Sequence, residues 1–217
     1  MNMQEKHITV TRTARYFTLG ELNQNTKDIW IFIHGHKQLA GKFIKQFKEL
    51  TGSGSYLIAP EGLMRFYNKG DNGDVGASWM TKEDRESDIK DYVSYLDKLY
   101  DEVIKRAKEK YNLTVNGLGF SQGVATLSRW LVLGKGKIDK AVFWCGNLAH
   151  DVDYAKAESL KQADIRLVFA DNDKYYPKDY YLTQEKILAD AGINFKTQIF
   201  SGGHEVSFEL MKSYGIV

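Results

Sequence analysis

Short runs of β-branched and aromatic residues alternate along this chain with longer stretches of helical pattern. The first of these runs, at residues 29–33, reads Ile-Trp-Ile-Phe-Ile and is continuously apolar, as expected of a strand buried on both faces of a sheet. Further runs of this kind follow at residues 56–59, 113–120, 141–145, 165–170 and 193–200. Because strands that alternate with helices usually form a parallel sheet covered on both faces, the sequence predicts an α/β fold with a mostly parallel sheet.

Helices are predicted between these strands. The stretch after residue 81 carries apolar residues at three- and four-residue spacing from Ile89 to Ile104, which is the pattern of a helix packed on a core, and Thr81 is the expected N-cap. Other helices are predicted at residues 40–50, 122–133, 179–191 and 206–213.

Two other segments carry a weaker pattern. Residues 7–12 and 16–19 are β-rich and close together, so the chain is expected to open with a hairpin. Residues 61–80 are rich in Gly and Asn and are expected to form one long loop, either functional or a plain surface loop.

Composition limits the class of protein. The 217 residues are within the usual range for one domain, so residues 1–217 are expected to form a single domain. A net charge of +2, with the lysines spread along the chain, gives no reason to expect a nucleic-acid partner. The single cysteine, Cys145, excludes an intrachain disulfide and is expected to be a buried, inert thiol. No signal peptide and no membrane span are predicted, so a cytoplasmic protein is expected, with its oligomeric state left open.

Residues 119–123 read Gly-Phe-Ser-Gln-Gly and match the pattern G-x-S-x-G. In this pattern a sharp turn between a strand and a helix presents a serine hydroxyl at the edge of a sheet, and flanking glycines avoid clashes in the turn. Here an apolar run ends at Phe120 and an apolar helical stretch begins just after Ser121, which is the context that the pattern requires. We therefore expect Ser121 to be a nucleophile.

A serine hydroxyl is a poor nucleophile without a base, and in folds with this turn the acid and the base follow the serine along the chain. Two histidines follow Ser121. His204 lies in a Gly-rich turn after the last predicted strand, whereas His150 leaves no strand for an acid between it and the serine, so His204 is the expected base. Asp171 and Asp173 both follow the preceding strand, and one of them is expected to hold the imidazole.

The pair His34-Gly35 ends the first parallel strand, where the chain can turn to offer a backbone N–H to an oxyanion hole. The N–H of Gln122, at a helix N-terminus, is the second expected donor. The competing interpretation of His34 and His36 is a metal-binding pair. Nothing else in the sequence supplies a ligand set, so no metal and no cofactor are expected.

With these residues in place, the chain resembles the phospholipase/carboxylesterase family of α/β hydrolases, to which bacterial carboxylesterases and eukaryotic acyl-protein thioesterases belong. The resemblance runs through most of the chain, at residues 31–35 (strand ending in H-G-L-G), 58–60 (strand ending in Pro), 78–79 (S-W), 119–123, 171–177 (G-D-x-D-P-x-V-P) and 202–204 (G-G-H). It implies an α/β-hydrolase fold without a large lid. It also implies that Asp173 is the acid and that the first oxyanion donor is the N–H of His36.

The chain departs from the family's motifs next to the site. His36 and Lys37 replace the usual leucine and glycine, Val124 replaces a glycine, and Lys174 replaces a proline. A polar His36 side chain at the acyl pocket would favour short acyl groups. Four apolar residues are candidates for the acyl pocket, with core packing as the alternative: Leu63, Phe66, Trp79 and Trp144.

The sequence therefore predicts a serine hydrolase that cleaves a small-molecule acyl ester or thioester through an acyl-serine intermediate. Two alternatives remain. A peptidase or amidase could use the same triad, because fold and triad alone do not fix the substrate. A non-catalytic binding protein could keep the same fold, although the full set of triad and oxyanion positions argues against it.

Overall fold

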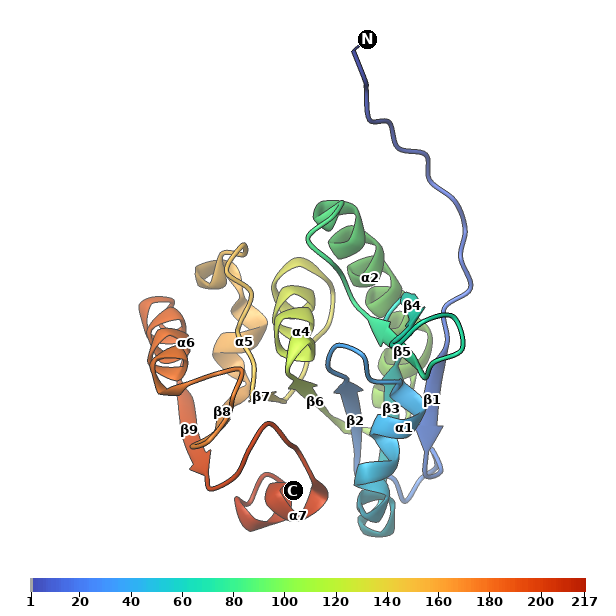
Figure 1. Ribbon diagram of the computed structural model, residues 1–217. Coiled ribbons are helices and arrows are strands. Elements are labelled where there is room, and N and C mark those ends of the chain that lie inside the picture. The colour runs from blue at the N-terminus through green and yellow to red at the C-terminus, as the bar shows by residue number, and fades with distance from the viewer. Residues whose placement is uncertain (1) are drawn as a thin grey trace.

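The computed structural model describes residues 2–217, and at its centre is one seven-stranded sheet (Figure 1). Its strands are β1 (Tyr16–Leu19), β2 (Asp28–Ile33), β3 (Ser55–Pro60), β6 (Thr114–Phe120), β7 (Lys140–Trp144), β8 (Asp164–Ala170) and β9 (Phe195–Phe200). They lie in the order β1-β3-β2-β6-β7-β8-β9, and every neighbouring pair is parallel except β1 and β3. The predicted α/β fold with a mostly parallel sheet is therefore confirmed.

The sheet buries side chains on both faces. In β2, Ile29, Ile31 and Ile33 pack into one hydrophobic cluster, while Trp30 and Phe32 pack into a second cluster on the opposite face. All five side chains are almost completely inaccessible to solvent. Because successive residues of a strand point to opposite faces, a strand buried on both faces must be apolar throughout, which explains the continuous run in the sequence.

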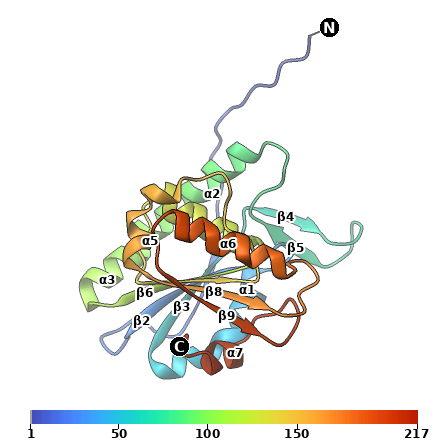
Figure 2. The ribbon, with the colours of Figure 1, turned by 90° about the vertical axis from the view of Figure 1, so that its left-hand side faces the viewer.

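Helices cover each face. One face is covered by α2 (Arg85–Leu99), a π-helical turn (Tyr100–Lys105), α3 (Arg106–Tyr111), α4 (Gln122–Leu133), α5 (Glu158–Gln162) and α6 (Lys178–Asp190). The other face carries α1 (Ala40–Phe43), a 3₁₀ segment (Ile44–Ser53) and α7 (Phe208–Ser213). Figure 2 shows the sheet between these two layers. The parallel strands all end at the same edge, so residues that follow β2, β6, β8 and β9 are brought together there.

The expected N-terminal hairpin is wrong. Residues 2–15 form no strand, and they lead away from the body of the molecule (Figures 1 and 2). β1 pairs instead with β3, in antiparallel register from Tyr16 opposite Pro60 to Leu19 opposite Leu57. Residues 7–12 have the composition of a strand. Such a segment forms a strand only where it can pair with the edge of a sheet and pack against a neighbouring surface.

Residues 61–80 are not one irregular loop. They contain a two-stranded antiparallel sheet of β4 (Met64–Tyr67) and β5 (Val75–Ser78), with Met64 opposite Ser78. The next helix begins later than predicted, at Arg85, with Asp84 as N-cap. Thr81 instead closes a local turn, because its hydroxyl accepts the N–H of Glu83 at 3.2 Å.

Between β7 and β8 the chain forms only short helical segments. These are a 3₁₀ turn (Tyr154–Lys156) and α5, so the expectation of no large lid is confirmed. Within residues 2–217, no helix has the length and apolar character needed to cross a membrane.

Candidate active site

Ser121 lies in a sharp turn between β6 and α4, with φ 55° and ψ −121°. A positive φ is strained for a residue with a side chain, and such strain concentrates at functional sites. The flanking glycines are required by close packing. A Cβ at Gly119 would meet the carbonyl of Gly123, and a Cβ at Gly123 would meet the carbonyl of Ile33 in β2. The turn is held by the N–H of Ser121, which donates to the carbonyl of Trp144 at 3.0 Å.

His204 and Asp173 are hydrogen-bonded to each other near this turn. Nδ1–H of His204 donates to Oδ2 of Asp173 at 2.7 Å, and the carboxylate is buried. Its other oxygen, Oδ1, accepts the backbone N–H groups of Tyr175 at 2.8 Å and Tyr176 at 3.2 Å. A carboxylate that accepts Nδ1–H leaves Nε2 unprotonated in the neutral imidazole, which is the form of a general base. Nε2 of His204 makes no hydrogen bond with any described residue.

Asp171, the other candidate acid, has a different partner. Its Oδ1 accepts the N–H of Gly202 at 3.0 Å, and its side chain is exposed. This bond ties the loop after β8 to the turn that carries His204. Asp171 therefore stabilises the geometry of the loops, while Asp173 contacts the imidazole directly.

The two expected oxyanion donors are at the ends of β2 and β6. A Cβ at Gly35 would lie 3.0 Å from Cβ of Ser121, so the turn that carries His36 passes close to the nucleophile. Gln122 is the first residue of α4, where backbone N–H groups have no partner within the helix. Among the described residues, neither the N–H of His36 nor that of Gln122 has an acceptor. Both groups are free to donate to a substrate oxygen.

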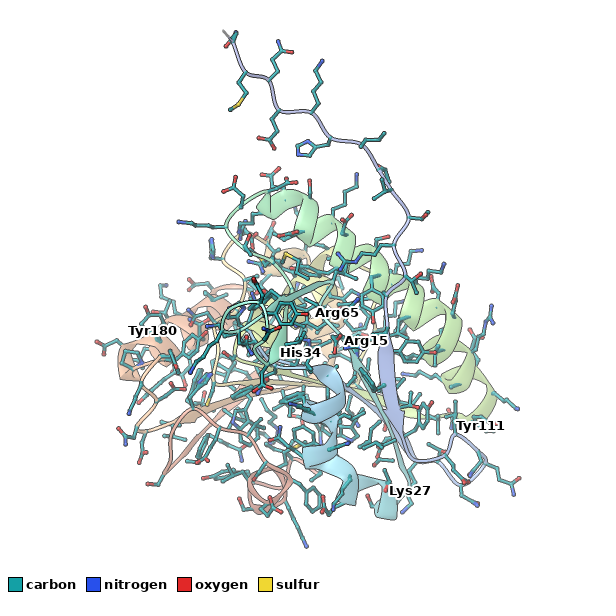
Figure 3. The ribbon with its side chains drawn as sticks, turned by 45° about the vertical axis from the view of Figure 1, so that its right-hand side comes forward. Arg15, Lys27, His34, Arg65, Tyr111 and Tyr180 are labelled. Atoms are coloured by element: carbon teal, nitrogen blue, oxygen red, sulfur yellow. The ribbon has the colours of Figure 1, made fainter. Side chains whose placement is uncertain are left out.

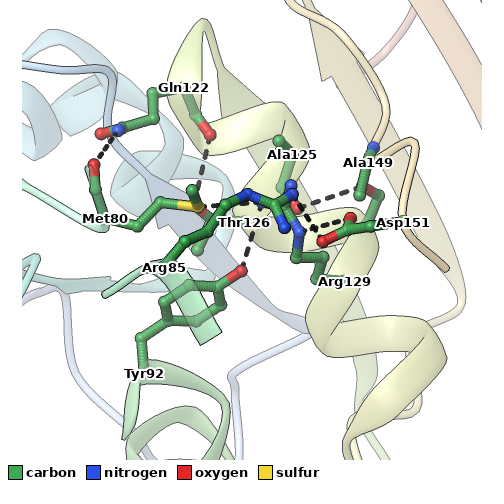
Figure 4. A network of polar contacts seen from close by, with 10 residues as sticks. Met80, Arg85, Tyr92, Gln122, Ala125, Thr126, Arg129, Ala149 and Asp151 are labelled. Atoms are coloured by element: carbon green, nitrogen blue, oxygen red, sulfur yellow. Dashed lines mark hydrogen bonds and ion pairs between the residues drawn. The ribbon is translucent and has the colours of Figure 1, made fainter. Parts of the chain in front are cut away.

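Ser78, at the end of β5, connects the side chains of the two donor residues. Its hydroxyl lies 3.2 Å from Nδ1 of His36 and 3.1 Å from Nε2 of Gln122. Nε2 of Gln122 also donates to the carbonyl of Met80 at 2.9 Å (Figure 4). The sequence offered only the resemblance of the Ser78-Trp79 pair as a signal for this role.

A partly buried network of polar contacts supports the loop that contains Met80 (Figure 4). Arg129 of α4 donates to Oδ1 of Asp151 at 2.8 Å, and Arg85 donates to Oδ2 of the same carboxylate at 2.6 Å. The Arg129 guanidinium also lies 3.4 Å from Sδ of Met80 and 3.4 Å from the hydroxyl of Tyr92. α2, α4 and the loop after β7 are thereby joined beneath the candidate site.

The four pocket candidates separate into two pairs. Phe66 is half-buried and stacks on His36 with ring centroids 5.5 Å apart, and Leu63 is half-buried beside the core. Trp79 and Trp144 are core side chains with 1% and 0% of their surface exposed. Their indole N–H groups donate to the carbonyls of His34 at 2.9 Å and Glu205 at 2.8 Å. Trp79 and Trp144 are thus enclosed by their neighbours, as in the core packing that the sequence left open as the alternative.

His34 is buried, and both of its ring nitrogens have partners. Nδ1–H donates to the carbonyl of Gly35 at 2.8 Å, and Nε2 accepts the N–H of Gly62 at 3.0 Å. Figure 3 shows it in the interior, whereas Tyr180 lies at the outer edge. Burial lowers the pKa of His34 to about 4, so the imidazole stays neutral near pH 7. These contacts make His34 a structural support for the turns at Gly35 and Gly62.

The free energy of unfolding is expected to fall as the pH drops from 6.5 to 4. The folded protein resists protonation of His34, whereas the unfolded chain protonates with the ordinary pKa of 6.5. Stability is therefore complete above pH 6.5 and is lost progressively down to the folded-state pKa, by about 3 kcal/mol at most. Urea unfolding at several pH values should show a shallower pH dependence in His34→Gln than in the wild type. The same substitution at the exposed His150 provides the control, and it should leave the pH dependence of stability unchanged. If the stability of His34→Gln depended on pH in the same way as that of the wild type, the prediction would be contradicted.

Two groups of described residues could each offer three ligand atoms within 4.8 Å of one another. The first is Cys145, Asp173 and His204, and the second is the exposed set Glu5, His7 and Asp84. Burial raises the pKa of the Cys145 thiol, which opposes the thiolate form that metals bind. His34 and His36 belong to neither group. The side chains of Cys145, Asp173 and His204 thus favour acid–base chemistry over metal binding.

Hydrolytic activity is expected to survive dialysis against EDTA, because His34 has no free ring nitrogen and Asp173 and His204 are bonded to each other. The measurement is the initial rate on an ester before and after chelation. Loss of the rate with recovery on addition of Zn²⁺ would show that a metal takes part.

Solved structures of similar fold include carboxylesterases and an acyl-protein thioesterase. A carboxylesterase from Mesorhizobium loti superposes with a TM-score of 0.72 at 15% identity, covering 94% of each chain. Acyl-protein thioesterase 2 from Zea mays gives 0.69 at 15% identity, over 93% of this chain and 96% of that one. The chain has the α/β-hydrolase fold. Esterase PE8 also matches, with a TM-score of 0.66 at 18% identity, over 94% of this chain and 97% of its own. No family model matches the sequence, and no curated protein matches it either.

Proposed function

We propose that this protein is a serine hydrolase of the phospholipase/carboxylesterase type, with residues 1–217 as one catalytic domain. Its substrate is a small-molecule acyl ester or thioester. The observation that carries the proposal is the 2.7 Å bond between Nδ1 of His204 and Oδ2 of Asp173, at the sheet edge where Ser121 occupies a strained turn. The fold shared with esterases and a thioesterase supports it.

In the proposed mechanism, Oγ of Ser121 attacks the acyl carbon while Nε2 of His204 takes its proton. The backbone N–H groups of His36 and Gln122 donate to the oxyanion, and Asp173 stabilises the imidazolium. His204 then gives the proton to the leaving group, and an acyl-serine remains. Water attacks this ester with His204 as base, the bond between the acyl carbon and Oγ breaks, and Oγ regains a proton from His204.

The direct test is covalent labelling with a fluorophosphonate probe. Intact mass and peptide mapping should place one adduct on Ser121. Activity should then be measured on p-nitrophenyl esters, thioesters and p-nitroanilides of matched acyl groups. Faster hydrolysis of anilides than of esters would favour a peptidase or amidase. Absence of both labelling and turnover would indicate a binding protein that keeps the fold.

Replacing His36 by leucine is expected to move the substrate preference toward longer acyl chains. His36 stacks on Phe66 and places a polar ring at the rim of the site, where burial and the neighbouring Lys37 lower its pKa. A polar ring covered by alkyl groups loses hydrogen bonds to water, so the wild type should prefer short acyl groups, roughly C2 to C6. In His36→Leu each additional buried methylene should gain at most ~0.8 kcal/mol, or about fourfold in kcat/KM.

The measurement is kcat/KM over p-nitrophenyl esters of rising chain length. The oxyanion hole should be preserved, because it uses the backbone N–H of residue 36 and not its side chain. Superimposable profiles for the wild type and His36→Leu would show that the imidazole does not contact the acyl group.

A further inference from the structure

Two tyrosines that follow the proposed acid pack against the imidazole of His204. The ring of Tyr176 is stacked on it, with centroids 5.6 Å apart and an interplanar angle of 29°. The ring of Tyr175 meets it edge to face, with centroids 4.9 Å apart and an angle of 65°. Neither tyrosine was a candidate on sequence grounds. The proposed base is therefore bordered by two aromatic rings from the loop after β8.

The two rings differ in their exposure to solvent. Tyr176 is half-buried, whereas 71% of the surface of Tyr175 is exposed. A single exposed tyrosine is ordinary on a protein surface, and what sets Tyr175 apart is its contact with the base. Its backbone is held by the acid, because its N–H donates to Oδ1 of Asp173 at 2.8 Å. Tyr175 therefore offers an exposed aromatic surface at a fixed place beside the imidazole.

The proposed mechanism decides which part of the substrate lies beside this surface. When the tetrahedral intermediate collapses, the bond between the acyl carbon and the leaving oxygen breaks, and that oxygen takes the proton held on Nε2 of His204. A general acid must lie within hydrogen-bond reach of the atom that it protonates. The alcohol portion of an ester is therefore held beside the imidazole, next to the ring of Tyr175.

The order of the strands separates the alcohol portion from the acyl group. The strand that leads to Ser121, β6, lies between β2 on one side and β7, β8 and β9 on the other. His36 follows β2 and stacks on Phe66 of β4, whereas Tyr175 follows β8 and His204 follows β9. Figure 1 shows β4 and β5 on one side of β6, and β8 and β9 on the other. An ester that lies across Ser121 thus has its acyl group toward His36 and its alcohol portion toward Tyr175.

We propose that Tyr175 determines specificity for the leaving group, and that the preferred substrates are esters of alcohols that carry an aromatic ring. The inference rests on the proposed function. Aromatic rings favour offset-stacked or edge-to-face contact with one another, which a saturated ring of similar size does not reproduce. The contact is made with the alcohol portion alone. It therefore acts on formation of the acyl-serine and not on its hydrolysis.

The principal test is a competition between two alcohols for the acetyl-serine. p-Nitrophenyl acetate forms the acetyl-enzyme in the presence of equal amounts of benzyl alcohol and cyclohexylmethanol. In this reversal of the leaving step, the alcohol oxygen attacks the acyl carbon, His204 takes its proton, and Oγ of Ser121 is displaced and receives that proton. The initial ratio of benzyl acetate to cyclohexylmethyl acetate reports on the leaving-group site, because both products come from the same acyl-enzyme.

We expect the wild type to form benzyl acetate in excess and Tyr175→Ala to lower the ratio about 3- to 10-fold, the range of an aromatic pair. Tyr175→Phe should keep the wild-type ratio, because it keeps the ring. Tyr175→Leu keeps an apolar side chain without a ring and should resemble Tyr175→Ala. The matched control is Tyr180→Ala, which removes an exposed ring that packs against Tyr176 and not against His204. Its ratio should stay within about twofold of the wild type, as is usual for surface substitutions.

The rate of hydrolysis of the acetyl-enzyme separates a specificity role from a structural one. Every variant keeps the backbone N–H of residue 175 and with it the bond to Asp173. The alcohol has departed by this stage, so the rate in Tyr175→Ala should stay within about twofold of the wild type. A slower rate with an unchanged product ratio would show that Tyr175 only supports the acid and the base, and would overturn the inference.

The outcomes also distinguish this inference from the proposed function. If the wild type is not acylated at Ser121, the proposed function fails and the inference fails with it. If the wild type is acylated but Tyr175→Ala gives the same product ratio, the proposed function stands and the specificity role of Tyr175 is overturned.

Discussion

Replacing Ser121 by alanine is expected to lower kcat by about 10⁴-fold or more while the protein stays folded. The loss is large because Ser121 is the proposed nucleophile and the members of a triad act as a unit. The strained turn should survive, because its glycines and the bond from the N–H of residue 121 to the carbonyl of Trp144 are unchanged. Alanine at φ 55° carries a strain similar to that of serine, so stability should change by about 0.5 kcal/mol or less.

The measurements for this variant are steady-state kinetics on an ester and thermal unfolding. Ser213→Ala provides the control, because Ser213 is exposed on α7 and bonds only to the carbonyl of Leu210 at 3.0 Å. A Ser121→Ala enzyme with near-normal turnover, or a phosphonate adduct on another residue of the wild type, would remove Ser121 from the mechanism.

The strands of the central sheet were predictable because burial on both faces leaves a simple signature. A strand such as β2 has no polar face, so its sequence is continuously apolar. Because parallel strands end at the same edge of a sheet, the sequence also predicts that Ser121, His204 and the two aspartates lie at one edge. In the structure His204 is hydrogen-bonded to Asp173 and not to Asp171, and its ring lies 4.8 Å from that of Phe120, the residue before Ser121. Their catalytic roles stay a prediction.

Other features depended on contacts that a single sequence does not encode. Residues 7–12 resemble a strand but find no edge to pair with. The β4–β5 sheet was missed because β5 reads Val-Gly-Ala-Ser, with weak strand propensity. Position 76 in β5 has room only for a glycine, because a Cβ there would lie 2.6 Å from the carbonyl oxygen of Lys37. Trp79 and Trp144 were indistinguishable in sequence from pocket residues, because an apolar ring suits a core and a binding surface equally.

The position of Tyr176 shows the same limit at the candidate site. An aromatic residue three places after an aspartate is unremarkable in sequence. Its stacking on the ring of His204 arises only because the loops after β8 and β9 meet at the same edge of the sheet. The triad follows a known chain order and can be predicted, whereas the groups around it depend on how each loop folds.

Asp173→Asn is expected to lower kcat by about 10⁴-fold, as the equivalent change does in a serine-protease triad. The amide oxygen of asparagine can still accept the N–H groups of Tyr175 and Tyr176, so the turn should persist. The amide nitrogen then faces Nδ1 of His204. Because that nitrogen is a donor, it favours the imidazole tautomer protonated on Nε2, which cannot take the proton of Ser121.

The matched variant is Asp171→Asn, which carries the same chemical change two residues away. Its amide oxygen can keep the bond from the N–H of Gly202, and Asp171 has no contact with His204 among the described residues. We expect kcat of Asp171→Asn to stay within about threefold of the wild type, as for other surface changes. Steady-state kinetics and urea unfolding on both variants would separate loss of the base from loss of the fold. If Asp171→Asn were the crippled enzyme and Asp173→Asn the mild one, the acid would be Asp171, and the loop after β8 would have to rearrange in solution to bring it to Nδ1 of His204.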